Sequence, residues 1–87
     1  MKRQYTVIDE AGLHARPVSL LVAKASSHPN EITMWYKDKP YTMKSILMIM
    51  SLSVQQHDQF SIEVQGDNAE EILDSLEAIL KENKLAS

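Results

Sequence analysis

A histidine and an arginine stand close together at the point where an apolar helical pattern begins. The segment AGLHARPVSLL, residues 11–21, contains Gly12, His14 and Arg16. An imidazole can accept a phosphoryl group and hold it covalently, and an arginine can bind the resulting phosphate through charge-assisted hydrogen bonds. The chain shows no Ser-His-Asp spacing, no glycine-rich phosphate loop and no paired metal ligands. These residues therefore indicate a phosphohistidine site, with His14 as the acceptor and Arg16 as a phosphate ligand.

The predicted helix begins at Ala15, which places His14 at its N-cap. The backbone N–H groups of Ala15 and Arg16 then have no acceptor within the helix, and a helix N-terminus attracts anions. Pro17 suits the first turn because it has no N–H group to satisfy. The field of the helix also disfavours a protonated imidazole, and Gly12 permits a close approach of the preceding loop. We expect the amides of Ala15 and Arg16 to bind phosphate.

The same residues also fit less specific roles. A histidine at a helix start is commonly only a cap or a surface residue, and an arginine in the first turn opposes the helix dipole. His28 and His57 lie far from His14 in the sequence, and their spacing supports no metal site. We predict neither metal nor cofactor. A small metal-binding or RNA-binding domain is the competing hypothesis, although a net charge of −3 without a Lys/Arg run argues against nucleic acid.

The composition predicts one compact domain over residues 1–87. Apolar residues make up 44% of the chain and charged residues 24%, as in ordinary globular proteins. There is no cysteine, so no disulfide is possible, and no apolar segment follows the basic N-terminus as in a signal peptide. The longest apolar run, residues 46–50, is far too short to cross a membrane. We expect a monomer in the cytoplasm with no membrane insertion.

Alternating and helical patterns predict the elements that must position these residues. We expect strands over residues 5–8, 32–36 and 60–64, and a short strand around Tyr41 and Met43. Pro40 places that short strand at a sheet edge, and the KDK segment before it predicts a tight turn. We expect a first helix from Ala15 to the breaker SSHPN at residues 26–30. A short helix should follow over residues 46–52, with Ser45 as its cap. The last helix should begin near Ala69, with Asp67 as its cap and Glu70 completing a capping box.

The resulting order is β-α-β-β-α-β-α. Each strand has one apolar face and each long helix has one apolar stripe, so the strands and helices must bury these faces against one another. We therefore predict an α+β fold, an open-faced two-layer sandwich in which three helices cover one face of a four-stranded antiparallel sheet.

Two motifs at this separation resemble those of one protein family. GLHARP, residues 12–17, is similar to the active-site motif of HPr, the histidine-containing phosphocarrier family of the bacterial sugar phosphotransferase system. KSILMIMSL, residues 44–52, resembles its regulatory-serine segment in the form found in low-GC Gram-positive bacteria. The resemblance extends over essentially the full length of the chain, and the family fold is the sandwich predicted above.

The resemblance implies a covalent relay rather than a stand-alone enzyme. His14 would accept a phosphoryl group on Nδ1 from enzyme I, which takes it from phosphoenolpyruvate, and pass it to IIA domains of sugar permeases. Arg16 would assist the transfer, and the amides of Ala15 and Arg16 would hold the phosphate. An HPr-like regulatory binding module, or a carrier of a nitrogen-type phosphotransferase system, is the alternative. Retention of His14 and Arg16 argues against the silent relatives, in which the histidine is replaced.

The resemblance also implies regulation and docking at the second motif. Ser45 matches the serine phosphorylated by HPr kinase/phosphorylase, a modification that slows transfer from enzyme I and creates a partner for a catabolite-control repressor. The short helix that follows is apolar all round but can bury only one side, so it should expose an apolar patch to protein partners. The predicted interface consists of Pro17, Ile46, Leu47, Met48 and Met50.

Several residues depart from the family pattern. Met48 stands where Gram-positive relatives usually have glycine, which should strengthen the helix by about 1 kcal/mol. Ser53 stands where glycine is nearly universal, and a positive φ there would strain a serine. Ala11 replaces a polar residue often found before Gly12. The turn in YKDK, residues 36–39, lacks the usual Asn-Gly pair.

Overall fold

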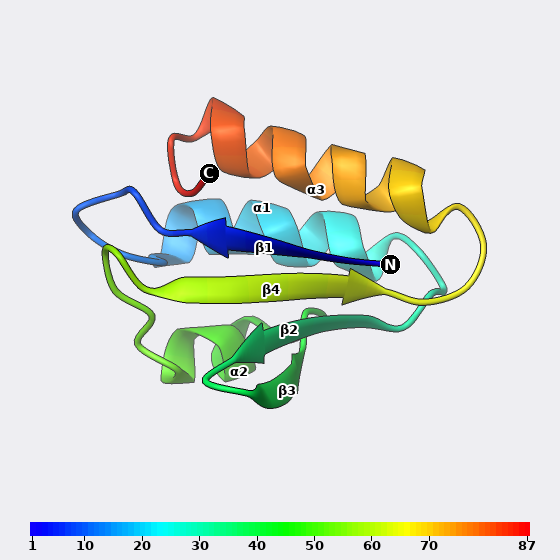
Figure 1. Cartoon of the computed structure of the whole chain (residues 1–87), viewed down its shortest axis with the longest axis horizontal. Helices are drawn as coiled ribbons and strands as arrows, with labels where there is room; N and C mark the ends of the chain where they lie inside the picture. Colours follow the sequence, from blue (N-terminus) through cyan, green and yellow to red (C-terminus); the bar gives the residue numbers. More distant parts are fainter.

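Four strands and three helices follow one another in the predicted order. The computed structural model describes residues 1–87. The strands are β1 (Lys2–Thr6), β2 (Ile32–Tyr36), β3 (Lys39–Thr42) and β4 (Gln59–Val64), and the helices are α1 (Ala15–Ser26), α2 (Ile46–Ser51) and α3 (Ala69–Glu82). Figure 1 shows α1 and α3 running side by side along the sheet. The predicted element order is confirmed.

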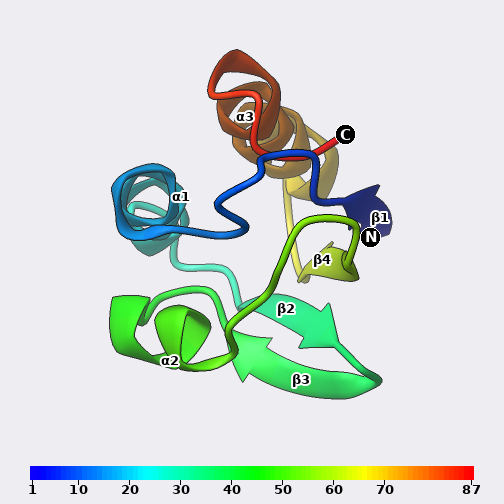
Figure 2. The same ribbon diagram turned by 90° about the vertical axis from the view of Figure 1, so that its left-hand side faces the viewer.

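The strands form one antiparallel sheet with the spatial order β1-β4-β2-β3. Figure 2 shows the helices gathered on one side of this sheet, which leaves the other face uncovered. The predicted open-faced α+β sandwich is confirmed. β3 is an edge strand and Pro40 lies opposite Trp35 in its pairing with β2, as expected for a residue that cannot donate to a ladder.

The core lies between the sheet and the helices. Alternate residues of β4 point into it, and the apolar stripes of α1 and α3 face them. The apolar stripe predicted for α1 is confirmed, because Val18, Leu21, Val22 and Ala25 are all buried. The members of the hydrophobic core contributed by these three elements are Phe60, Ile62, Val64, Val18, Leu21, Val22, Ala25, Ile72, Leu73, Leu76 and Leu80.

The first strand differs from the prediction at both ends. β1 begins at Lys2 and ends at Thr6, so Val7 and Ile8 lie beyond it. Val7 instead forms an isolated bridge with Ala86, and the Ile8 N–H donates to the carbonyl oxygen of Leu85 at 2.9 Å. Val7 still exchanges hydrogen bonds with His57 and Asp58 before β4, and the C-terminal segment pairs with the other side of this stretch, from Thr6 to Ile8. This long-range pairing has no signal in the local sequence pattern.

The predicted cap of the last helix is wrong. Asn68, not Asp67, occupies the N-cap of α3, with φ 60° and no side-chain capping hydrogen bond. The side-chain amide of Asn30 donates to the carbonyl oxygens of Gln65 and Asp67, at 2.7 and 2.8 Å. These bonds hold the loop ahead of the helix, and Asn68, a residue type that tolerates the left-handed region, makes the final turn.

The turns around β3 and α2 carry residues with positive φ. Lys37 and Asp38 have φ values of 52° and 63°, as in a primed hairpin turn, so the tight turn is confirmed although Asn-Gly is absent. Ser53, just beyond α2, has a φ of 52°. Left-handed backbone is costly for any residue with a Cβ. The backbone strain predicted for a serine at this position is thus confirmed.

Replacing Ser53 with glycine should stabilise the protein. Ser53→Gly removes the Cβ penalty of the left-handed backbone, so we expect the free energy of unfolding to rise by about 1 kcal/mol. Ser51→Gly is the matched control, because Ser51 ends α2 in helical backbone and should lose stability instead. Chemical denaturation of the three proteins measures both changes. Equal effects at the two positions would contradict the strain at Ser53.

Candidate functional site

Gly12 lets the loop before α1 pass against the chain that follows α2. Its φ is 70°, and a Cβ placed on it would lie 2.4 Å from the carbonyl oxygen of Val54. The Gly12 N–H donates to the Asp9 carbonyl oxygen at 2.9 Å, and the next amide, of Leu13, donates to the Val54 carbonyl oxygen at 2.9 Å. The close approach predicted at Gly12 is confirmed, and it fixes the chain just before His14.

His14 occupies the N-cap of α1, as the sequence predicts. Its backbone is extended, with φ −113° and ψ 168°, and its side chain makes no capping hydrogen bond. The ring is therefore not tied to the helix end, and 42% of the side chain is exposed. Its Nε2 lies 3.0 Å from Oδ2 of Asp9, while Nδ1 has no hydrogen-bond partner.

Asp9 is a site residue that sequence reasoning missed. Its Oδ1 accepts a hydrogen bond from the Ala11 N–H at 2.8 Å, which leaves Oδ2 for His14. The Ala11 amide, and after it the His14 ring, hold the pKa of the Asp9 carboxyl below its ordinary value. Aspartates commonly accept a hydrogen bond from the amide two residues ahead in a turn. This tendency is the sequence signal that could have predicted the position of the Asp9 carboxylate. Its contact with the ring depends on the fold of the loop.

The first amides of α1 are unpaired beside His14. The backbone N–H groups of Ala15 and Arg16 donate to no acceptor, whereas the Val18 N–H begins the helical ladder on the His14 carbonyl oxygen at 3.1 Å. The Arg16 side chain is exposed and forms no ion pair. The structure thus brings together an imidazole, two free amides and one free guanidinium, which can surround a small anion.

The end of α2 borders the same site. A shallow depression next to His14 is also lined by Gly12, Val54, Met50 and Ser53. Figure 2 shows the chain before α1 and the chain after α2 converging at this end of the molecule. An apolar surface on α2 is therefore continuous with the surroundings of the histidine.

Most of the predicted interface is exposed, but Pro17 is not. Leu47 is 83% exposed, Ile46 41% and Met48 40%, whereas Met50 is half-buried against the core. Pro17 is buried, so its inclusion in the interface is wrong. Residues 17, 18 and 21 share one side of α1 at helical spacing, and this side faces inward.

Ser45 caps α2, as predicted. Its Oγ accepts a hydrogen bond from the Met48 N–H at 3.2 Å. The side of α2 that faces inward carries the buried Ile49, and the opposite side carries the apolar residues described above. The structure therefore places the Ser45 hydroxyl at the end of a helix whose outer surface is apolar.

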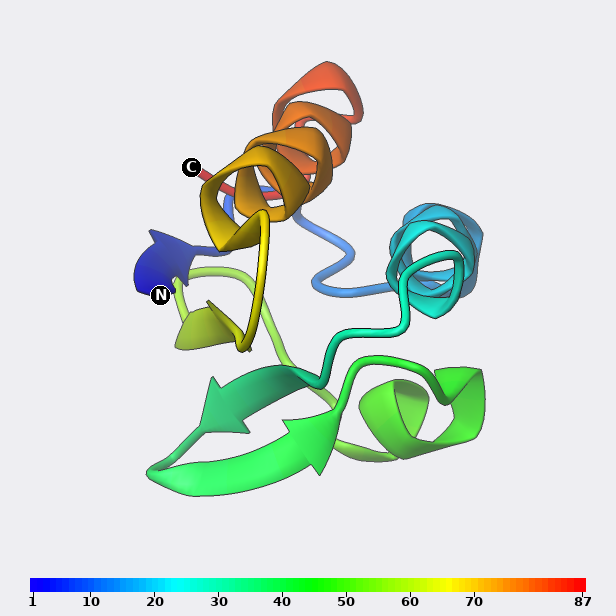
Figure 3. The same ribbon diagram turned by 90° about the vertical axis from the view of Figure 1, so that its right-hand side faces the viewer.

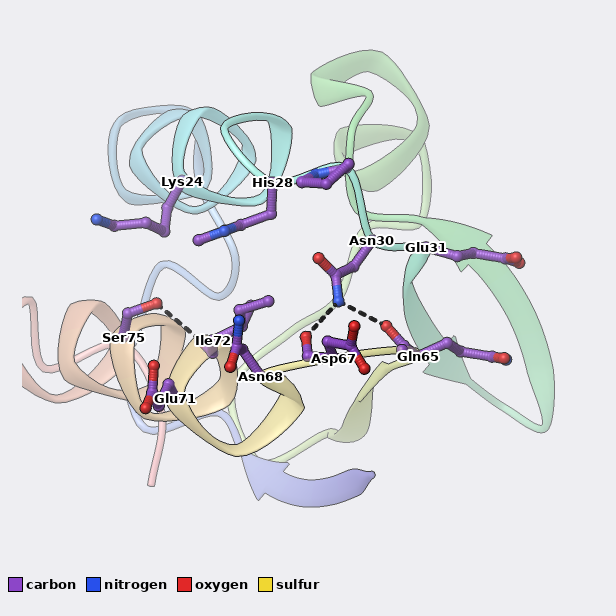
Figure 4. A pocket seen from close by; sticks show the side chains of 12 residues that line it. Lys24, His28, Asn30, Glu31, Gln65, Asp67, Asn68, Glu71, Ile72 and Ser75 are labelled. Atoms are coloured by element: carbon purple, nitrogen blue, oxygen red, sulfur yellow. Dashed lines mark hydrogen bonds between the residues drawn. The ribbon is translucent and has the colours of Figure 1, made fainter.

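A second pocket lies at the opposite end of α1 from His14. Figure 3 shows this end, where the chain leaving α1 runs toward β2, and Asn30 in that chain bonds the loop between β4 and α3. Figure 4 shows Lys24 and His28 pointing into the space between the two helices, with Glu71 across from them. Acidic and basic side chains are mixed there, and His28 is far from His14. The three histidines are thus not brought together by the fold.

Two further properties of the molecule are plain from the structure. No group of three or more histidine, cysteine, aspartate or glutamate side chains is arranged to hold a metal ion. None of the helices has the length and apolar character needed to cross a bilayer.

Comparison with known proteins assigns the chain to a family. A family model described as the PTS HPr component phosphorylation site matches residues 1–82. The phosphocarrier protein HPr of Lysinibacillus sphaericus is 40% identical over 84 residues, which cover 97% of this chain and 96% of that protein. The chain belongs to the HPr family. The motif that contains His14 therefore lies in an HPr fold and not in an unrelated sandwich.

Solved structures of HPr relatives have the same architecture. A histidine-containing phosphocarrier protein of Mycoplasma superposes with a TM-score of 0.92 at 27% identity and covers 98% of this chain and 97% of its own. Crh, a catabolite repression HPr of Bacillus subtilis, superposes with a TM-score of 0.71 at 31% identity and covers 85% of each chain. The HPr family thus includes a protein named for catabolite repression as well as phosphocarriers.

An alanine at Gly12 should damage the site by displacing its loop. The added Cβ meets the Val54 carbonyl oxygen in left-handed backbone, so we expect Gly12→Ala to lower the free energy of unfolding by roughly 3 kcal/mol. Gly66→Ala is the matched control, since its φ is also positive, at 86°, but its Cβ meets only a side-chain atom at 3.3 Å. Denaturation curves should show a clearly smaller loss for Gly66→Ala; equal losses would contradict a steric role for Gly12.

Proposed function

We propose that this chain is the phosphocarrier of a sugar phosphotransferase system in the cytoplasm. His14 accepts a phosphoryl group from enzyme I, itself charged by phosphoenolpyruvate, and passes it to IIA domains of sugar permeases. The observation that carries the proposal is the group of His14, the unpaired amides of Ala15 and Arg16 and the free Arg16 side chain at one helix start, in a chain of the HPr family.

The composition of the site suits a carrier. A phosphoryl group on His14 would meet two helix amides and one exposed guanidinium, which together compensate part of its negative charge. The ring is well exposed, so donor and acceptor proteins can both reach it. A site with few, solvent-exposed ligands binds phosphate weakly enough to release it. The chain thus acts as a covalent intermediate between enzymes, and not as a catalyst by itself.

The apolar surface of α2 is the proposed docking site for these partners. Ile46, Leu47 and Met48 are exposed, and Met50 extends this surface to the depression beside His14. Methionine side chains adapt to differently shaped partners because they are flexible and polarizable. A protein that meets enzyme I and several IIA domains in turn needs such an adaptable surface.

We also propose that phosphorylation of Ser45 regulates the carrier. HPr kinase/phosphorylase would modify the hydroxyl that caps α2, and a phosphate at a helix N-terminus is electrostatically tolerated. The new charge would lie beside the apolar docking surface and weaken the contact with enzyme I. A catabolite-control repressor would recognise the modified form, and the similarity to Crh supports this branch.

A regulatory binding module is the second candidate. The resemblance to a protein named for catabolite repression favours it, as does the exposed apolar surface of α2. A carrier in a nitrogen-type phosphotransferase system would use the same histidine with different partners. His14 and Arg16 argue for retained phosphoryl transfer in either setting.

Incubation with enzyme I and phosphoenolpyruvate tests the carrier. We expect one acid-labile phosphate per chain, detected by intact-protein mass spectrometry, and none on His14→Ala. Arg16→Ala should slow the transfer by about tenfold, since one charge-assisted hydrogen bond is lost. His28→Ala is the control, because His28 lies at the opposite end of α1, and it should be labelled as the unmodified chain is. Labelling of His14→Ala, or no labelling of the unmodified chain, would refute the proposal.

Incubation with ATP and HPr kinase tests the regulatory branch. We expect an acid-stable phosphate that is absent from Ser45→Ala and still present on Ser51→Ala, which removes the other hydroxyl of the same helix. Ser45→Ala also loses a cap, so its unfolding free energy should fall by about 1 kcal/mol. The phosphorylated chain should then receive phosphate from enzyme I more slowly. If the kinase leaves no label, the chain serves transport alone.

A further inference from the structure

The carboxylate of Asp9 forms a hydrogen bond with one of the two ring nitrogens of His14. Its Oδ2 lies 3.0 Å from Nε2 of His14, and its Oδ1 is already bound by the Ala11 amide at 2.8 Å. An ionised carboxylate can only accept hydrogen bonds. The proton between Oδ2 and Nε2 must therefore belong to Nε2. In a neutral ring, the lone pair is then on Nδ1.

We propose that Asp9 is a positioning residue that determines which nitrogen of His14 accepts the phosphoryl group. It holds the proton on Nε2 and leaves Nδ1 as the nucleophile. This inference rests on the proposed role of His14 as a phosphoryl acceptor, and it adds a residue and a function for that residue.

The transfer step balances with Asp9 in this role. The lone pair of Nδ1 forms a bond to phosphorus as the bond between phosphorus and the donor breaks. The electron pair of the broken bond leaves with the donor atom. The ring then carries a positive charge and keeps its proton on Nε2, where Asp9 compensates the charge. Transfer to the next protein reverses these changes.

Asp9 also opposes phosphorylation of the other nitrogen. A phosphoryl group on Nε2 would have to displace the carboxylate or lie against it, and two negative groups at such a distance repel each other strongly. Nδ1 has no hydrogen-bond partner and is bonded to the ring carbon that carries the main chain.

Backbone bonds on both sides of Asp9 keep its carboxylate in place. Its N–H donates to the Leu85 carbonyl oxygen at 3.3 Å, and its own carbonyl oxygen accepts from the Gly12 N–H at 2.9 Å. Ile8 also donates to Leu85, at 2.9 Å, and Leu85 is completely buried. The C-terminal segment thus holds the backbone of Asp9 in place, and the Asp9 carboxylate in turn orients the His14 ring.

The other charged residues near His14, Glu10 and Arg16, do not place the proton on Nε2. Glu10 is exposed and forms no ion pair or side-chain hydrogen bond, and Arg16 lies on the helix without an ionic partner. Asp9 is the only residue that forms a hydrogen bond with the ring. Glu10→Gln therefore removes one negative charge from the same loop without touching the contact, which makes it a matched control.

Chemical phosphorylation with phosphoramidate tests the proposal without any partner protein. This small donor transfers its phosphoryl group to an imidazole and releases ammonia, and heteronuclear NMR distinguishes Nδ1-linked from Nε2-linked phosphohistidine. We expect only the Nδ1 product at His14 in the unmodified chain and in Glu10→Gln. Asp9→Ala should give both products. His28 and His57 should also give both in every variant, because their rings have no hydrogen-bond partner.

Asp9→Asn provides a second variant, in which the direction of the hydrogen bond with Nε2 of His14 is reversed. If the Ala11 amide keeps the side-chain oxygen, the asparagine NH₂ group faces Nε2 and donates to it. The proton then moves to Nδ1, and phosphorylation at Nδ1 should slow by about tenfold. An amide spectrum like that of the unmodified chain establishes that the loop is folded. A product at Nδ1 alone in Asp9→Ala, or an Nε2 product in the unmodified chain, would overturn the proposal.

The result separates this inference from the proposed carrier function. If enzyme I fails to label the chain but Asp9→Ala changes the phosphoramidate products, the positioning role stands and the relay does not. If enzyme I labels the chain and the products are the same with and without Asp9, the relay stands and the positioning role is wrong.

Discussion

The site depends on one close contact between two backbones. Gly12 passes so near Val54 that no side chain fits between them, and the Leu13 amide then bonds the Val54 carbonyl oxygen. This contact ties the loop before α1 to the chain that follows α2. It places His14 at the start of one helix and Met50 beside it from another. The proposed phosphoryl acceptor and the proposed docking surface, which come from separate parts of the sequence, are thereby joined.

The short helix α2 buries only one of its sides and exposes apolar residues on the other. Of its apolar residues, Ile49 is fully buried and Leu47 is almost fully exposed. A helix this short has little stability of its own, so its cap at Ser45 and its anchor in the core must hold it. The hydroxyl that would carry a regulatory phosphate is therefore also a structural cap. This coupling explains how a single modification could act on the docking surface without unfolding the helix.

Local patterns predicted most of the fold, and long-range contacts account for what they missed. The order of elements, the edge position of Pro40 and the N-cap position of His14 follow from residues adjacent in the sequence. The pairing of Val7 with Ala86 and the contact of Asp9 with His14 require the loop to be folded first. Asp67 matched a capping box, yet Asn30, distant in sequence, holds that loop in another conformation. Motif residues were thus easier to predict than the residues that position them.

Opposing electrostatic influences meet at the His14 ring. The N-terminus of α1 disfavours positive charge on the ring, whereas the Asp9 carboxylate on the other side favours it. The helix end also attracts an incoming phosphate that the carboxylate repels. In the proposed transfer the two do not cancel, because the carboxylate holds a proton on Nε2 while Nδ1 is left to bond phosphorus. With Arg16 as the one free cation at this helix start, the proposed phosphate would be oriented more than tightly bound, as a group that is passed on must be.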